Sequence, residues 1–262
     1  MLEALLGAGT IGRVFRARHV DGSVAALKVL HPHLVENEDA RARFLREARA
    51  LSNVQHRSIG RIIGAFEESG SSFLALELYE GVSLRGVLDA RFKLSPQAAI
   101  PLLRELVEAL GALHEAGWIH RDLKPENVMV LDPDAAAPRN VRLLDFGLAR
   151  PMVFATGDVR TAAGMFVGSL AYAAPEQILG DAITPATDWW SLGIVAFEML
   201  AGHRPFQGSS RPAMARNLLR EAPPALDVDR KLALWVEALL AKDAHQRPAS
   251  FRDVLAGLNA AV

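Results

Sequence analysis

Two polar segments near the middle of the chain restrict its fold and its chemistry more than any other feature. The first reads His-Arg-Asp-Leu-Lys-Pro-Glu-Asn over residues 120–127, and the second reads Asp-Phe-Gly over residues 145–147. Between them, the apolar stretches 128–131 and 141–144 are typical of two short strands joined by a proline- and alanine-rich turn, residues 132–140. The sequence therefore predicts a polar loop, a hairpin with a loose tip and a second polar turn in succession.

The residue types in these segments suit proton transfer beside a bound cation. A carboxylate close to a substrate hydroxyl can accept its proton, and Asp122 suits this role. An asparagine five residues further on can supply an oxygen to a hard cation such as Mg²⁺, which is the role expected of Asn127. Asp145 adds an anionic oxygen ligand at the end of a strand. We expect His120 to be structural, packing and hydrogen-bonding beneath the loop.

Length and composition indicate a globular protein. At 262 residues the chain exceeds the commonest size of a single domain, so one large domain or two lobes sharing a cleft is expected. Charged residues make up 23% and the net charge is −1, which gives no bulk basicity for binding nucleic acid. The chain has no cysteine, which excludes disulfides, thiolate metal sites and cysteine nucleophiles.

The amino terminus does not have the pattern of a signal peptide, because no basic region is followed by an apolar stretch and a small-residue cleavage site. The chain also has no run of about 18 apolar residues that could cross a membrane. We therefore expect a cytoplasmic location. The short flanks are typical of an excised domain or a very short gene, and we expect any membrane anchor of a full-length protein to lie outside this segment.

The apolar pattern changes from strand-like to helical along the chain. Strands are expected at residues 13–18, 24–30, 60–66 and 73–78, interrupted by one helix with the apolar stripe Phe44, Leu45, Ala48 and Leu51. Helices are expected from Pro96 to Gly117, over 188–200, around 213–220, over 231–240 and from Ser250. We predict an α+β fold with a strand-rich lobe, residues 1–79, and a helix-rich lobe, residues 80–262, that together form one catalytic domain with a cleft between the lobes.

A glycine-rich motif, Gly-Ala-Gly-Thr-Ile-Gly-Arg-Val over residues 7–14, opens the first lobe. Missing Cβ atoms let backbone N–H groups approach phosphate oxygens closely. Because a strand follows the glycines, the motif fits a hairpin lid over phosphates better than a dinucleotide-binding turn. From the motif alone, an ordinary glycine-rich turn stays open as an alternative.

A lysine and a glutamate in the first lobe form a candidate ion pair. Alternation over residues 24–28 places Lys28 on one face of a buried strand, and Glu47 lies close to the buried stripe of the helix. As a pair, they would hold the α- and β-phosphates of a nucleotide. The alternatives are a lysine whose amine reaches water and a glutamate that is a solvated helix charge.

Taken in order, these motifs resemble those of the protein kinase superfamily, and most closely the eukaryotic-type serine/threonine kinases of bacteria, over essentially the whole chain. The resemblance includes the segment Ala174-Pro175-Glu176. It implies a two-lobed kinase fold, with a small antiparallel sheet lobe that carries one helix and a larger helical lobe.

The resemblance also implies the catalytic roles. Asp122 is then the base or hydroxyl-orienting group, while Asn127 and Asp145 hold Mg²⁺, with Mn²⁺ as an alternative metal. Lys28 positions the α- and β-phosphates of ATP, and Lys124, which steadies the γ-phosphate, distinguishes serine/threonine from tyrosine kinases. The implied ATP-binding residues are Gly7, Ala8, Gly9, Thr10, Ile11, Gly12, Val14, Ala26, Lys28, Glu47, Leu76, Glu77, Tyr79, Asn127 and Asp145.

By the same resemblance, residues 148–167 are an activation loop that is switched by phosphorylation. Thr161 is the first candidate phosphosite and Thr156 the second, and an unmodified loop threonine is the alternative for each. Arg121 resembles the arginine that pairs with the loop phosphate. Ser169 belongs to the substrate-docking turn, residues 168–172, where it is expected to hydrogen-bond to the catalytic loop.

Three further residues are expected to support the fold. Glu176 should pair with Arg247, and Asp188 should brace the catalytic loop from below. The hairpin tip is longer than the tight turn of the family and is expected to be a tolerated surface insertion. A start at Met1 predicts a short first strand.

The leading hypothesis is a serine/threonine protein kinase that transfers the γ-phosphate of Mg·ATP to protein hydroxyls and autophosphorylates its activation loop. We expect protein substrates, self-association for trans-autophosphorylation, no nucleic acid and no membrane segment in this chain. One rival is a pseudokinase that acts as a scaffold, but such proteins usually lack the lysine, the base or the magnesium aspartate. The other is a small-molecule phosphotransferase, which would typically lack residues 174–176 and the docking turn.

Overall fold

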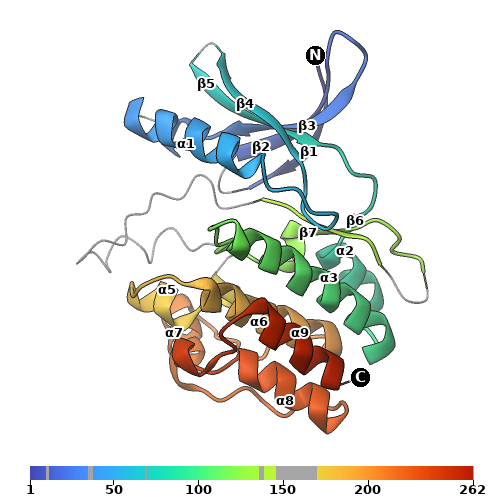
Figure 1. Ribbon diagram of the computed structural model, residues 1–262, viewed down its shortest axis with the longest axis vertical. Coiled ribbons are helices and arrows are strands. Elements are labelled where there is room, and N and C mark those ends of the chain that lie inside the picture. Colours follow the sequence, from blue (N-terminus) through green and yellow to red (C-terminus); the bar gives the residue numbers. More distant parts are fainter. Residues whose placement is uncertain (10–11, 35–37, 69, 136–138, 146–169, 262) are drawn as a thin grey trace. The chain divides into compact units, whose positions relative to one another are not determined.

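The computed structural model describes residues 1–9, 12–34, 38–68, 70–135, 139–145 and 170–261 (Figure 1). These residues form two compact units, and the boundary falls between Glu80 and Gly81. The first unit is built on an antiparallel sheet and the second is mostly helical, so the α+β prediction is confirmed. None of the helices within the described ranges is long and apolar enough to cross a membrane.

The first unit is a five-stranded antiparallel sheet with the strand order β1-β2-β3-β5-β4 (Figure 1). Its elements are β1 (Leu2–Ala8), β2 (Gly12–Arg18), β3 (Val24–Leu30), η1 (Pro32–Leu34), α1 (Glu38–Leu51), β4 (Ile62–Glu68) and β5 (Ser71–Glu77). Helix α1 packs against β4 and buries Phe44, Ala48 and Leu51, as its apolar stripe predicts. The four expected strands are therefore present, with bounds shifted by two residues or fewer.

The prediction of a short first strand is wrong. Strand β1 has seven residues and pairs with β2 from Leu2 opposite Ala17 to Ala8 opposite Arg13. Most of its side chains are exposed, so backbone pairing holds the strand in place rather than an apolar stripe. A strand of this kind has no hydrophobic pattern by which it can be recognised in the sequence.

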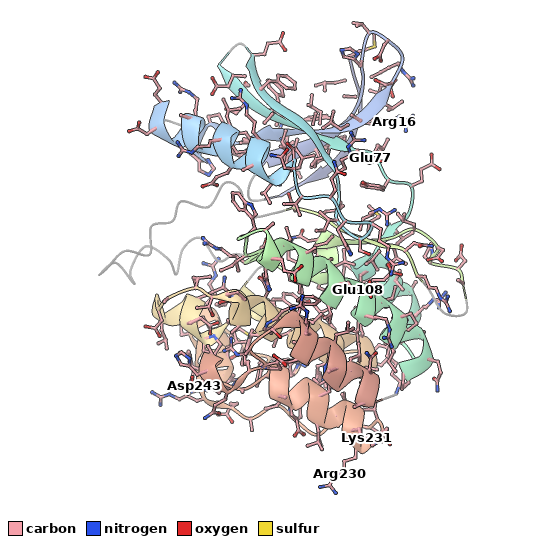
Figure 2. All side chains as sticks on the ribbon, viewed as in Figure 1. Arg16, Glu77, Glu108, Arg230, Lys231 and Asp243 are labelled. Carbon is pink, nitrogen blue, oxygen red and sulfur yellow. The ribbon has the colours of Figure 1, made fainter. Side chains whose placement is uncertain are left out.

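Register in the sheet fixes the positions of the strand residues implied in ATP binding. In β3 the side chains of Ala26, Lys28 and Leu30 are buried and alternate with half-buried ones. Lys28 lies opposite Val14 of β2 on one side and opposite Leu74 of β5 on the other. Figure 2 labels Arg16, which pairs with Ala26 on β3. The predicted burial of Lys28 is confirmed.

The second unit contains a small sheet, β6-β7-β8, and the larger helices. Its elements are β6 (Val82–Ser83), α2 (Leu84–Arg91), α3 (Pro96–Glu115), η2 (Pro125–Asn127), β7 (Val128–Val130), β8 (Val141–Leu143), η3 (Leu170–Tyr172), α5 (Pro175–Leu179), α6 (Pro185–Ala201), α7 (Arg211–Arg220), α8 (Arg230–Leu239), η4 (Ala244–Gln246) and α9 (Phe251–Ala260). Arg230 and Lys231, at the start of α8, are labelled in Figure 2.

Helix α6 is the centre of the second unit. Its residues 187–200 are all buried, and α3 and α8 pack against it (Figure 1). A mostly apolar helix is expected inside a core rather than at a surface, and its few buried polar side chains then need partners. It begins at Pro185, after the N-cap Thr184, which is three residues earlier than the sequence predicts. Proline at the first helical position needs no hydrogen-bond partner, so the helix can begin there.

Caps at the other helices follow the sequence closely. Helix α3 begins with Pro96 after Ser95, whose hydroxyl accepts from the N–H of Ala98. Its apolar residues Leu103, Leu106, Val107, Leu110 and Leu113 are all buried. Helix α9 follows Ser250, where the sequence predicts a helix to begin, and Ser250 and Asp253 form a capping box in which each side chain accepts from the backbone N–H of the other residue.

One glycine of the glycine-rich motif, Gly12, is required by packing in the first unit. A Cβ atom on Gly12 would lie 2.1 Å from the carbonyl oxygen of Val29, because β2 and β3 approach closely there. A Cβ atom on Gly7 or Gly9 would meet no described atom within 4 Å. The last glycine is therefore needed by the sheet, whereas the first two leave room beside the backbone.

We predict that Gly12→Ala separates the start of β2 from β3 and destabilises the first unit by about 1–3 kcal/mol, as overpacking does. Amide hydrogen exchange in β2 and β3 should become faster, and the temperature of unfolding should fall. The matched control Gly7→Ala should leave both unchanged. Unaltered exchange in the Gly12→Ala protein would contradict this explanation.

Candidate active site

The polar loop at residues 120–127 brings the predicted base and its partners together. The Lys124 ammonium lies 2.8 Å from Oδ2 of Asp122. The Asn127 side-chain amide donates to the backbone oxygen of Asp122 at 2.8 Å and lies 3.4 Å from its Oδ2. The short turn η2 folds because Pro125 fixes its first position, and this turn carries Asn127 back towards Asp122. One carboxylate thus lies beside an ammonium and an amide within a single loop.

A buried carboxylate on α6 braces this loop. Asp188 has no exposed surface, and its two oxygens accept from the backbone N–H groups of His120 and Arg121, each at 2.8 Å. His114 of α3 donates from Nε2 to the same carboxylate at 2.7 Å, since an ionised carboxylate can only accept. The predicted brace at Asp188 is confirmed.

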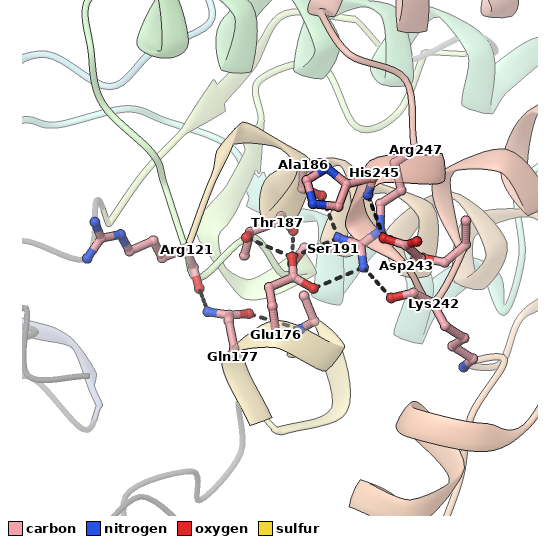
Figure 3. A network of polar contacts seen from close by, with 12 residues as sticks. Arg121, Glu176, Gln177, Ala186, Thr187, Ser191, Lys242, Asp243, His245 and Arg247 are labelled. Carbon is pink, nitrogen blue, oxygen red and sulfur yellow. Dashed lines mark hydrogen bonds and ion pairs between the residues drawn. The ribbon is translucent and has the colours of Figure 1, made fainter. Parts of the chain in front are cut away.

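Arg121 adopts an unusual backbone conformation that this brace stabilises. Its φ is +67°, in the left-handed region that non-glycine residues rarely adopt. Its carbonyl accepts from the side-chain amide of Gln177 at 3.0 Å, and the oxygen of that amide accepts from the N–H of Ala174 at 2.9 Å (Figure 3). Gln177 therefore links the catalytic loop to the start of α5.

His120 has the structural role that the sequence predicts. Its ring is buried, Nδ1 accepts from the N–H of Asp122 at 3.3 Å, and Nε2 lies 3.0 Å from the carbonyl of Leu144. Because Nδ1 is an acceptor here, the proton must be on Nε2, which donates to Leu144. His120 thus joins the catalytic loop to the residue that precedes Asp145.

The two residues expected to hold a metal lie on segments that are bonded to each other. The N–H of Leu144 donates to the carbonyl of Asn127 at 2.7 Å, and Asp145 follows directly with φ +62°. The amide nitrogen of Asn127 is used within the loop, so its amide oxygen is the atom that can face a cation. Asn127 and Asp145 together provide one neutral and one anionic oxygen donor, which fits Mg²⁺.

A site with few protein ligands is also what Mg²⁺ bound to a nucleotide requires. Within the described ranges, no group of three or more His, Cys, Asp or Glu side chains could hold a metal by itself. Mg²⁺ is usually held by one or two carboxylates together with substrate phosphates, because it gives up its waters reluctantly. With one carboxylate, that of Asp145, and one amide oxygen, that of Asn127, the donor set fits a metal that is held partly by phosphates.

The first unit carries the other residues implied in ATP binding. Lys28 is 4% exposed, a degree of burial that a lysine rarely reaches without an anionic partner. The predicted pair between Lys28 and Glu47 stays a prediction. In the glycine motif, the N–H of Gly9 donates to the carbonyl of Gly12 at 2.9 Å, and Nε2 of His31 donates to the carbonyl of Gly9 at 3.0 Å.

Several predicted residues lie outside the described ranges. These are Thr10 and Ile11 of the glycine motif, Phe146 and Gly147 after the magnesium aspartate, the candidate phosphosites Thr156 and Thr161, and Ser169.

A buried ion pair supports the segment that follows the docking turn (Figure 3). Arg247 donates to both carboxylate oxygens of Glu176, at 2.8 and 3.0 Å, and its three other N–H groups donate to backbone carbonyls of residues 186, 241 and 242. All five guanidinium donors are therefore satisfied. The hydroxyl of Thr187 also donates to Glu176, at 2.8 Å. The predicted pairing of Glu176 with Arg247 is confirmed.

The pKa of Glu176 shows which effect dominates at this pair. Burial raises the pKa of the carboxyl, but the hydrogen bonds and charge of Arg247, together with the Thr187 hydroxyl, outweigh it. The pKa is consequently held below the ordinary value of 4.5.

Comparison with known proteins gives the family. The family model described as "Protein kinase domain" matches residues 2–257. The chain therefore belongs to the protein kinase family, and the resemblance stated from its motifs is confirmed.

Similar proteins include several bacterial kinases. The serine/threonine-protein kinase pkn2 of Myxococcus xanthus is 38% identical over 264 residues, which cover 98% of this chain and 31% of that protein. The serine/threonine-protein kinase PknL of Mycobacterium tuberculosis is 35% identical over 217 residues, which cover 82% of this chain and 52% of that protein. The chain thus spans only a third to a half of these relatives' lengths.

A solved structure has the same fold. It is the crystal structure of Rad53 1-466 in complex with AMP-PNP, with a TM-score of 0.80 and 25% sequence identity. The match covers 97% of this chain and 63% of that one. The two-lobed kinase fold expected from the motifs is confirmed.

The pH dependence of stability should report the pair of Glu176 and Arg247. The pKa of Glu176 is lowered in the folded state, so its contribution is complete above about pH 4.5 and is lost as the pH falls further. In Arg247→Met the buried carboxylate loses its cation, which should cost about 3–5 kcal/mol at neutral pH. Burial then raises the pKa of Glu176, so this variant should become more stable, not less, as the pH falls from neutral.

Urea unfolding followed by tryptophan fluorescence at several pH values measures how the free energy of unfolding changes with pH in the wild-type protein and in Arg247→Met. The double variant Glu176→Gln/Arg247→Met removes both charges and should lose this part of the pH dependence. Parallel pH profiles for the wild-type protein and Arg247→Met would show that the pair does not control the pKa of Glu176.

Proposed function

We propose that this chain is the catalytic domain of a serine/threonine protein kinase, which transfers the γ-phosphate of Mg·ATP to serine and threonine hydroxyls of proteins. The observation that carries the proposal is the position of Asp122, whose carboxylate lies beside the Lys124 ammonium and the Asn127 amide in a loop braced by Asp188. Family membership and the named bacterial relatives support the same reaction class.

Each residue of the loop has a distinct part in this proposal. Asp122 orients the substrate hydroxyl and accepts its proton as the new oxygen–phosphorus bond forms. Lys124, which is paired with Asp122 in this structure, would neutralise charge that develops on the transferred phosphoryl group. The braced backbone keeps both groups in position, which is the main requirement of phosphoryl transfer.

The proposed ligands of Mg²⁺ are Asn127 and Asp145, and Mn²⁺ could replace it. When bound, the ion neutralises phosphate charge. In the first unit, Lys28 holds the α- and β-phosphates, and the missing Cβ atoms of Gly7 and Gly9 leave room for phosphate oxygens beside the backbone. By the family resemblance, residues 77–79, which include Glu77 and Tyr79, are the proposed hinge whose backbone reads adenine, and Leu76 is proposed to line the back pocket.

The activation segment adds a proposed regulatory step. Thr161, or in second place Thr156, is the proposed site of autophosphorylation, and self-association would let one copy modify another. Arg121 is the proposed partner of the phosphate, because a guanidinium binds phosphate bidentately. Arg121, whose backbone is strained, lies directly before Asp122. Ordering of the arginine by a phosphate would therefore restrict the position of the Asp122 carboxylate.

Two rival functions predict different outcomes. A pseudokinase would bind nucleotide without transfer, although Lys28, Asp122 and Asp145 are all present in this chain. A small-molecule phosphotransferase would modify a metabolite and leave protein hydroxyls unmodified. The presence of residues 174–176 and of the docking-turn sequence favours a polypeptide substrate.

Two single substitutions separate chemistry from binding. Asp122→Asn should keep ATP binding nearly unchanged and lower turnover by about 10²–10⁴-fold, as expected for loss of a general base. Asp145→Asn should weaken Mg²⁺-dependent ATP binding and abolish transfer. ATP affinity measured by calorimetry with and without Mg²⁺, together with phosphate incorporation into a protein substrate, distinguishes the two variants.

Asp227→Asn is the matched control, because Asp227 is an exposed aspartate of the second unit outside the loop. It should behave as the wild-type protein. Full turnover by the Asp122→Asn protein would remove the role assigned to Asp122.

A further inference from the structure

One guanidinium in the second unit bonds to three side chains from three different segments. Arg85 of α2 donates from Nε to Glu126 at 3.1 Å and from Nη2 to Tyr172 at 2.6 Å and Glu198 at 3.0 Å. The hydroxyl of Tyr172 in turn donates to the other carboxylate oxygen of Glu198 at 2.6 Å. Asp89, one turn further along α2, lies 3.8 Å from Nη1 of Arg85.

This cluster borders the place that a substrate hydroxyl must reach under the proposed function. Glu126 immediately precedes Asn127 in the turn η2, and Asn127 is bonded to Asp122. Tyr172 ends η3 and is the last residue of the docking turn that the family resemblance implies. A peptide presenting its hydroxyl to Asp122 would therefore pass close to the carboxylates that Arg85 occupies.

Burial in the cluster decreases towards Glu126. The Glu198 side chain is 8% exposed, that of Arg85 is 28% exposed and that of Glu126 is 47% exposed. The inner carboxylate is therefore desolvated and needs a cation, while the outer one faces solvent. Partial burial lowers the pKa of Arg85, but the neighbouring Tyr172, Glu198 and Glu126 outweigh it, so the pKa is raised and the arginine stays charged.

The shape of the site is shown by its present occupant. Glu126 and Glu198 accept from different nitrogens of one guanidinium, so their carboxylates are spaced to hold this planar group between them. If Arg85 were absent, two carboxylates and a tyrosine hydroxyl would remain around a space of guanidinium size and opposite charge.

We propose that Arg85 is a specificity-determining residue, an internal counter-ion that fills an anionic subsite formed by Glu126 and Glu198 and so prevents selection for an arginine in the peptide substrate. The proposal rests on the proposed function, because it assumes that a peptide binds beside Asp122. A purely structural role for Arg85 would make the protein less stable on substitution without changing which peptides it prefers.

The test is a comparison of peptide preference in the wild-type protein and in Arg85→Gln. The probes are fluorescently labelled serine peptides that differ only in a single arginine, moved through the positions on either side of the serine, with glutamine as its replacement. Binding is measured by fluorescence anisotropy, and kcat/KM is measured with Mg·ATP. Arg91→Gln, at the end of the same helix α2, is the matched control.

The wild-type protein and Arg91→Gln should bind all peptides within about threefold of one another. Arg85→Gln should bind the peptide with arginine at one position about tenfold or more tightly than its glutamine counterpart, since charge-assisted hydrogen bonds form only with arginine. Adding Glu126→Gln to Arg85→Gln should reduce that preference towards the wild-type value.

Arg85→Lys covers the case in which Arg85→Gln does not fold. It keeps a cation for Glu198, but an ammonium cannot bridge both carboxylates as the fork does, so a weaker preference of about threefold to fivefold is expected. A folded Arg85→Gln without any preference would overturn the proposal. So would a wild-type preference for arginine, or an unfolded Arg85→Gln together with an Arg85→Lys that does not discriminate.

The binding arm separates this proposal from the proposed function. If no folded variant transfers phosphate to any peptide, the kinase assignment fails. Fluorescence anisotropy without ATP still measures whether the anionic subsite binds the arginine peptides more tightly. If transfer occurs and the arginine preference does not change, only the role of Arg85 fails.

Discussion

The geometry of the catalytic loop depends on one buried carboxylate, that of Asp188. A left-handed backbone at Arg121 costs about 1–3 kcal/mol, and nothing in the residue itself compensates for it. The two charge-assisted hydrogen bonds from the backbone to Asp188 are each worth about 1.5–3 kcal/mol, so together they offset this strain. Without that carboxylate, the left-handed conformation of Arg121 would lose the two hydrogen bonds that offset its cost. The residues proposed to be catalytic therefore lie in a loop whose backbone is held by a side chain with no proposed part in the chemistry.

Other contacts in the second unit hold Asp188 and the loop in place. Helix α6, which carries Asp188, is buried over residues 187–200 and packs against α3 and α8. The segment next to it is fixed by Glu176 and Arg247, where every guanidinium donor has an acceptor. Gln177 then returns from α5 to the carbonyl of Arg121. The loop is thus held at both its N–H and its carbonyl groups by two separate elements, as a preorganised site requires.

Much of this arrangement could be predicted from local sequence signals. The caps at Ser95 and Ser250, the buried face of Lys28 and the pairing of Glu176 with Arg247 follow from spacing, alternation or the family pattern. What could not be predicted depends on contacts between distant segments. Nothing local marks the bond of His114 to Asp188 or that of Arg85 to Glu126, which join residues 74 and 41 positions apart in the sequence. Strand β1 was underestimated because backbone pairing, rather than an apolar stripe, holds it. The Gln177 bond had one weak signal, a glutamine at the third position of a short helix.

The central claim is that this chain moves phosphate from ATP to protein hydroxyls. The most direct measurement is incubation of the purified chain and casein with Mg·ATP, followed by mass spectrometry of both intact proteins and their peptides, with a sample lacking Mg²⁺ as the control. The account predicts Mg²⁺-dependent phosphate on serine or threonine, with Thr161 or Thr156 among the modified residues of the chain. Binding of ATP without phosphate on either protein would contradict it and would indicate a scaffold that keeps the kinase fold.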